Sequence, residues 1–147
     1  MSGDPLGKGT LGTGDYPLAE KRPEVVAGRR GKGLDEITVE TIVDGSATIE
    51  DLRISPRALR QQAEVARAAG RTALAENFER AAELADVPQD VIMQTYELLR
   101  PGRAASRAAM VEAAQGLRDT YGAVRMAAFV EEAAEVYERR GLFRSRY

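Results

Sequence analysis

Alanine constrains the fold of this chain more than any other residue type. Of its 147 residues 24 are Ala, whereas Phe and Tyr together supply only 8. A domain of this length buries roughly 70% of the surface of its unfolded chain, so one domain with a core is expected. Because so many of the apolar side chains are small, that core should be thin, closely packed and poor in large anchoring residues.

Helical periodicity with start and stop signals dominates the sequence from residue 55 onward. Ser55 followed by Pro56 predicts a helix N-terminus, and Gly70 predicts the end of that helix. Further helices are predicted over about 71–85, 88–99, 105–120 and 123–140. No segment alternates apolar and polar residues over the length of a strand. The sequence therefore predicts an all-α fold, a small bundle of about five helices.

Two shorter helices are predicted before this bundle. "ITVETIVDG" places Thr38 as an N-cap and Gly45 as a stop around a small apolar side. Thr48 and Asp51, three residues apart, predict a capping box for the second short helix. Residues 34–52 hold six acids and no base, so the entrance to the helical domain should be acidic.

Glycine placement separates an N-terminal arm from this domain. Eight of the 14 glycines fall in residues 1–33 and six in the remaining 114 positions, which predicts a flexible, extended, Gly-rich arm over 1–33 and a helical domain over 34–147. The arm contains the apolar stretch "GDYPLAEKRPEVV", in which Pro17 and Pro23 disfavour helix at the preceding residues. We expect this stretch to be a docking strap, held by a partner as much as by its own domain.

Composition excludes several functions. The net charge is −2, which argues against nucleic acid as the main partner, and the chain has no Cys and no His. No apolar stretch approaches the roughly 20 residues that span a bilayer, and no signal peptide is recognisable. We therefore expect a soluble, cytoplasmic chain without catalytic machinery of its own.

Three motifs with functional precedents have simpler interpretations. "GKGTLG" at 7–12 fits a dinucleotide-binding pattern but lacks the flanking strand and helix, and "GRRGKG" at 28–33 is interpreted as a solvated linker. The carboxylate pairs Glu79/Glu83 and Glu131/Glu135 would need Glu-x-x-His repeats to form a di-iron site. They are interpreted as charged helix surface.

Ala66 and Gly70, in a tight corner between two predicted helices, imitate a helix-turn-helix. This pattern leaves a regulatory or interaction module as the alternative function. In DNA recognition the second helix must present donors to bases and phosphates. Here it presents mainly acids, namely Glu76, Glu79 and Glu83 against Arg71 and Arg80. A packed helical hairpin is therefore the favoured interpretation.

Eight sequence words in order resemble one family from about Asp15 to Leu142. They are "DYPLA" with "PE" following, "LDEIT" with a Glu two residues later, "DLRIS", "LRQQAEVA", "NFERAAEL", "VPQD", "LRP" and "AAFVEEAAEVY". In these words the chain resembles the small (gamma) subunit of the adenosylcobalamin-dependent diol and glycerol dehydratases.

This resemblance implies a multi-subunit enzyme in which another chain performs catalysis. The family's holoenzyme is a dimer of heterotrimers of large, medium and small subunits, with adenosylcobalamin between the large and medium subunits and the substrate in the large one. It converts a 1,2-diol to the aldehyde and water by a radical mechanism. No catalytic, cofactor-binding or metal-binding residue is carried over to this chain, whose implied role is to pack on and support the large subunit.

Contact positions with the partner subunits are expected on the arm and on the helical domain. They are Tyr16, Pro17, Leu18, Arg53, Phe78, Arg80, Arg100 and Phe129. Residues 1–14 carry no amphipathic packaging helix, so this chain alone gives no signal for packaging into a bacterial microcompartment, and encapsulation through another subunit stays open.

Overall fold

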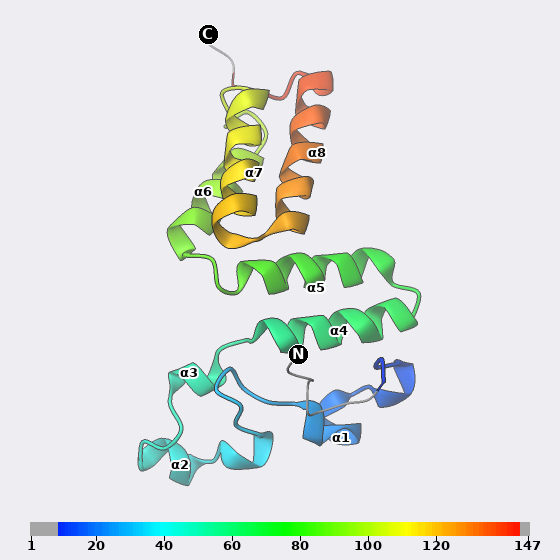
Figure 1. Cartoon of the computed structure of the whole chain (residues 1–147), viewed down its shortest axis with the longest axis vertical. Coiled ribbons are helices and arrows are strands. Elements are labelled where there is room, and N and C mark those ends of the chain that lie inside the picture. The colour runs from blue at the N-terminus through cyan, green and yellow to red at the C-terminus, as the bar shows by residue number, and fades with distance from the viewer. Residues whose placement is uncertain (1–8, 145–147) are drawn as a thin grey trace. The chain divides into compact units, whose positions relative to one another are not determined.

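The computed structural model describes residues 9–144, so the start of the predicted arm and of "GKGTLG" lies outside the described residues. Within this range the structure is helical, and its single strand-like feature is an isolated antiparallel bridge between Ala27 and Gly33. The all-α prediction is confirmed, including the long helices, which are α4 to α8 (Figure 1). The chain divides into two compact units, with the division between Ala82 and Glu83.

Short helices lead into two long ones in the first unit. In chain order they are η1 Thr13–Asp15, α1 Leu18–Lys21, η2 Pro23–Val25, η3 Leu34–Glu36, α2 Val39–Val43, α3 Ile49–Leu52, α4 Pro56–Ala68 and α5 Thr72–Leu84. The predicted caps are confirmed: Thr38 and Thr48 precede α2 and α3, and the Ser55 hydroxyl accepts a hydrogen bond from the Ala58 N–H at 3.1 Å. Local sequence signals therefore fix where these helices begin.

Helices α4 and α5 form an antiparallel hairpin (Figure 1). Ala63 and Ala66 of α4 and Ala75 of α5 are buried together, and Phe78 packs against them. An ion pair between Arg67 and Glu79, 2.8 Å long, joins the two helices at their surface. Alanines at the contact let the helix backbones approach closely, as the composition predicted.

The described part of the predicted arm is attached to α4. Leu11 and Leu18 are buried together with Val65 of α4. The Leu11 N–H also donates to Glu64 Oε2 at 2.9 Å, and Gln61 Nε2 donates to the Val25 carbonyl oxygen at 3.0 Å. Leu18 and Val25 of the expected docking strap thus contribute to the unit's own core, while the domain boundary at residue 33 stays a prediction.

Residues 27–33, which include the "GRRGKG" at 28–33 interpreted above as a solvated linker, form a turn against α3. The Gly28 N–H donates to the Lys32 carbonyl oxygen at 2.8 Å. Arg30 Nε lies 2.9 Å from Asp51 Oδ1, and the Asp51 side chain is fully buried. This contact between Arg30 and Asp51 Oδ1 is an ion pair without the alignment of a hydrogen bond. The other carboxylate oxygen, Asp51 Oδ2, accepts a hydrogen bond from the Thr48 N–H at 2.9 Å.

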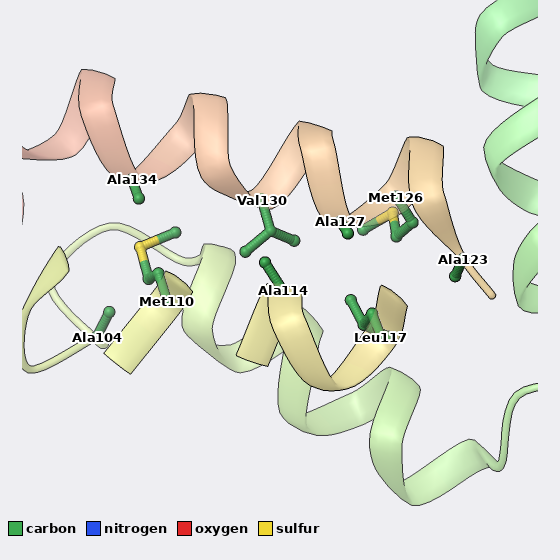
Figure 2. Close-up of a cluster of buried hydrophobic side chains, with 9 residues drawn as sticks. All are labelled: Ala104, Met110, Ala114, Leu117, Ala123, Met126, Ala127, Val130 and Ala134. Atoms are coloured by element: carbon green, nitrogen blue, oxygen red, sulfur yellow. The ribbon is translucent and has the colours of Figure 1, made fainter. Parts of the chain in front are cut away.

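The second unit contains α6 Gln89–Leu99, α7 Arg107–Tyr121 and α8 Val124–Arg140. Ser106 caps α7 through the Ala109 N–H at 3.2 Å, and Gly141 ends α8 in the left-handed region with φ +64°. Figure 2 shows the core, in which α7 and α8 face each other through buried residues. These residues are Ala104, Met110, Ala114, Leu117, Ala123, Met126, Ala127, Val130 and Ala134.

The first half of α8 carries apolar residues around most of its circumference, and its own unit buries only some of them in the described structure. Ala127 and Val130 are fully buried toward α7, but Val124 is 54% exposed and Phe129 39% exposed. The run of apolar residues supplies two faces, and the neighbouring helix covers one of them. An apolar face of α8 is left at the surface.

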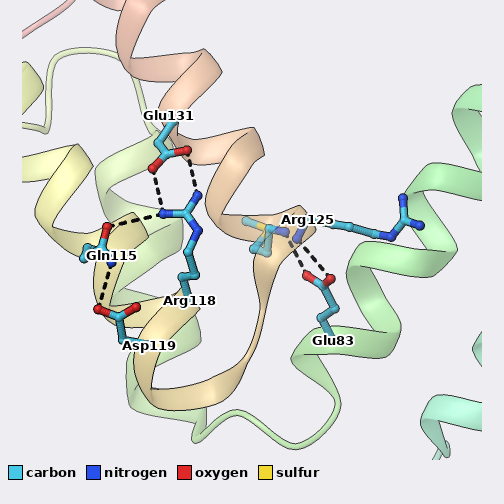
Figure 3. Close-up of polar contacts among 7 residues, drawn as sticks. Glu83, Gln115, Arg118, Asp119, Arg125 and Glu131 are labelled. Atoms are coloured by element: carbon cyan, nitrogen blue, oxygen red, sulfur yellow. Dashed lines mark hydrogen bonds and ion pairs between the residues drawn. The ribbon is translucent and has the colours of Figure 1, made fainter.

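Polar contacts fasten the N-terminus and the middle of α8 (Figure 3). Both oxygens of Glu83, at the end of α5, accept the Arg125 and Met126 N–H groups at 3.0 and 2.8 Å. Arg118 binds Glu131 through two hydrogen bonds of 2.9 and 2.8 Å, and this guanidinium lowers the pKa of the Glu131 carboxyl. Glu83 thus satisfies two of the amide groups that every helix N-terminus leaves without an intrahelical partner.

Replacing Gly116 by Ala is expected to raise the free energy of unfolding by about 0.5–1 kcal/mol, because glycine lowers the stability of a helix interior. Gly116 lies inside α7 at the surface, and an added Cβ would meet no atom within 4 Å. Urea unfolding followed by circular dichroism measures the change. Loss of stability would show that the glycine has a packing role that its open surroundings do not reveal.

Candidate subunit interface

A groove in the first unit is one candidate site for holding part of another protein. It lies between η1 and the α4–α5 hairpin, and its floor is formed by Val65 and Ala66, which are buried. The remaining lining residues are Thr13, Tyr16, Gln62, Ala69, Arg71, Leu74 and Phe78. Apolar and aromatic side chains with a few polar groups at the border are typical of the centre of a protein interface.

Tyr16 is positioned by the polar network of η1. Asp15 Oδ2 accepts the Gly12 N–H at 2.8 Å, and Asp15 Oδ1 accepts from Arg22 Nη1 at 2.9 Å. The Gly12 amide first, and then Arg22, lower the pKa of the Asp15 carboxyl, so this network is intact at neutral pH. The Tyr16–Pro17 peptide bond is cis, and the Tyr16 side chain is 54% exposed beside the groove.

Two of the predicted contact residues, Tyr16 and Phe78, meet in this groove although they are far apart in the sequence. Pro17 is exposed next to Tyr16. Leu18 is only 5% exposed, because it packs on Val65 in the core of the unit. Leu18 therefore supports the position of its neighbours and offers almost no surface of its own.

The remaining predicted contact residues lie elsewhere. Arg53 pairs with Glu50 at 3.3 Å, and Arg80 donates to the side chain of Asn77. In the second unit Arg100 pairs with Glu97 at 2.9 Å, and Phe129 is partly exposed on α8. None of these four residues is among those that line the groove, and their roles in binding stay predictions.

Sequence reasoning did not assign Gln62 and Leu74 to an interface, although both line the groove. Leu74 lies on the apolar side of α5 and is 38% exposed, so it is not fully used by the hairpin. Helical periodicity identifies an apolar side but does not show which of its residues the chain itself leaves uncovered. That information required the tertiary structure.

The groove and the rest of the described chain show no arrangement of metal ligands. No group of three or more His, Cys, Asp or Glu residues in the range 9–144 is placed to hold a metal ion. Glu79 and Glu131, considered above as members of carboxylate pairs, form ion pairs with Arg67 and Arg118. No helix in the same range is both long enough and apolar enough to cross a membrane.

Comparisons with known proteins identify the family. The family model "Dehydratase small subunit" matches residues 11–144. The propanediol dehydratase small subunit of Citrobacter freundii is 48% identical over 126 residues, which cover 86% of this chain and 73% of that protein. The protein of the same name from Salmonella typhimurium is 47% identical over 126 residues, covering 86% and 72%. The chain therefore belongs to the dehydratase small-subunit family.

Proposed function

We propose that this chain is the small subunit of an adenosylcobalamin-dependent diol dehydratase, which converts 1,2-propanediol or glycerol to the aldehyde and water. The observation that carries the proposal is the 48% identity over 126 residues with a protein named as a propanediol dehydratase small subunit. Because the similarity covers most of both chains, it supports the proposal that this chain occupies the small-subunit position in a related enzyme complex. The proposed partners are large and medium subunits, in a dimer of heterotrimers.

The residues of this chain do not fit a cobalamin or metal site. The sequence has no His, and no cluster of metal-ligating side chains lies in the part of the chain that the structure describes. We therefore propose that the cofactor is held by the large and medium subunits, and we derive no chemical step on this chain. Its proposed role is to pack on the large subunit and keep it in its active form.

Co-expression tests this proposal directly. Large and medium subunits from the same operon are produced with and without this chain, which carries an affinity tag. We expect the tag to purify one complex that dehydrates 1,2-propanediol when adenosylcobalamin is added, and we expect activity to be lost when this chain is omitted. A two-subunit enzyme of full activity and stability would contradict the proposed role.

A further inference from the structure

Residues 34–54, which we call the aliphatic segment, hold an unusual number of exposed large side chains. Seven of these side chains are between 47% and 81% exposed. The buried residues of the segment are Ala47 and Asp51, and none of its Leu, Ile or Val residues is buried. The seven are Leu34, Val39, Ile42, Val43, Ile49, Leu52 and Ile54. Single exposed apolar residues are normal, but a concentrated set on one segment marks an interaction site.

Polar contacts hold the segment in shape without using these side chains. Isolated helices as short as α2 and α3 are unstable in water. Here the Thr41 N–H donates to the Thr38 hydroxyl at 3.3 Å, the Ser46 N–H donates to Asp44 Oδ1 at 2.8 Å, and Asp51 contacts Arg30. The aliphatic side chains are therefore presented on a backbone that is already ordered, which lowers the entropic cost of binding.

The charge around these side chains restricts what can cover them. Glu40 and Asp44 flank the exposed valines of α2, and neighbouring neutral groups stabilise their ionised forms. The Glu40 backbone amide and the Thr38 hydroxyl lower the pKa of Glu40, and the hydroxyl and amide of Ser46 lower that of Asp44. A second copy of this chain would bring like charges together, and an anionic membrane surface would be repelled.

We propose that the aliphatic segment is a docking surface for the large dehydratase subunit, whose matching surface is apolar and bordered by Arg or Lys. This inference rests on the proposed function, which supplies the partner, and adds the surface used. Exposed valines and isoleucines would be buried at the centre of the contact, with Glu40 and Asp44 at its acidic border.

Two substitutions test the surface with little risk to folding. Val39 and Ile49 are the first residues of α2 and α3 and are 74% and 66% exposed. Asp is favourable at the start of a helix, so Val39→Asp and Ile49→Asp should leave the fold intact. The matched control is Val124→Asp, which makes the same type of change at the first residue of α8, 54% exposed in the second unit.

The measurement is binding of the full-length chain to the large subunit, alone and with the medium subunit, after circular dichroism confirms that every variant is folded. We expect Val39→Asp and Ile49→Asp together to weaken binding at least about 30-fold, as loss of a central apolar contact does. Val124→Asp should change it less than about threefold. Equal binding of the wild type and the double variant would overturn this inference and leave the proposed function standing, whereas no binding by the wild type would contradict the proposed function itself.

Further arms test the identity and charge of the partner. Glu40→Arg should weaken binding, and the affinity of the wild type should fall as salt is added. If neither Glu40→Arg nor added salt changed the affinity, the proposal that the partner's surface is bordered by Arg or Lys would be overturned. Sedimentation of the wild-type chain alone should show a monomer. If it showed a dimer, and if Val39→Asp and Ile49→Asp dissociated that dimer, the surface would be assigned to a second copy of the chain. If the variant with Val39→Asp and Ile49→Asp bound the large subunit normally and lost binding only to the medium subunit, the assignment to the large subunit would likewise be overturned.

Discussion

Replacing Met110 by Ala is expected to lower the free energy of unfolding by about 3 kcal/mol, within the 2–5 kcal/mol range for buried Met-to-Ala changes. Met110 is fully buried between α7 and α8 and is among the few large side chains in a core built mainly of alanine (Figure 2). Small neighbours have no side-chain atoms that can swing into the space it leaves. The cavity should therefore persist, and its full cost should appear in the stability.

Met93 offers a matched control for this experiment. It is 50% exposed on α6, so Met93→Ala removes the same atoms without opening a cavity, and its effect should stay within about 0.5 kcal/mol. Urea unfolding followed by circular dichroism at 222 nm compares both variants with the wild type. Equal effects of Met110→Ala and Met93→Ala would show that the core of the second unit can collapse around the missing side chain.

Helix ends could be predicted from the sequence because their signals are local. Ser55 with Pro56 starts α4 and Thr38 caps α2 as expected, and α8 ends at Arg140, in agreement with the predicted range of about 123–140. Each of these signals acts through hydrogen bonds or backbone angles within a few residues. The eight words of family similarity then added the identity of the family, which no cap or periodicity could supply.

Contacts between distant residues could not be predicted in the same way. The Leu11 N–H binds Glu64, 53 positions away, and this contact helps convert a predicted flexible arm into a packed segment. The Met126 N–H binds Glu83, 43 positions away, although the sequence identified Glu83 only as part of a charged surface. Periodicity and composition carry no information about such partners.

The exposure of apolar side chains was the second property that could not be predicted from the sequence. The apolar positions of α2 were recognised, but periodicity does not distinguish a side that packs inside its own unit from one that faces a partner. The candidate groove illustrates the same limit, because Tyr16 and Phe78 were proposed as contacts while Leu74, beside them, was not. Surfaces used between chains are recognised only when the chain's own packing is known.

Replacing Gly28 by Ala is expected to lower the free energy of unfolding of the first unit by about 2 kcal/mol, as forced overpacking does. A Cβ at Gly28 would lie 2.3 Å from the Asp51 carbonyl oxygen and 3.2 Å from its carbonyl carbon. Both are backbone atoms, so relief requires the turn at 27–33 to move away from α3. That movement would also disturb the contact of Arg30 with the buried Asp51 carboxylate.

Gly14→Ala is the control, since an added Cβ there meets no atom within 4 Å. Urea unfolding should separate the two variants, with Gly14→Ala close to the wild type. Because α3 carries Ile49 and Leu52, Gly28→Ala should also weaken binding to the large subunit if the aliphatic segment is the docking surface. Unchanged stability in Gly28→Ala would mean that the turn shifts at no cost and does not fix the position of α3. Reduced stability with unchanged binding would instead show that docking does not depend on the placement of α3.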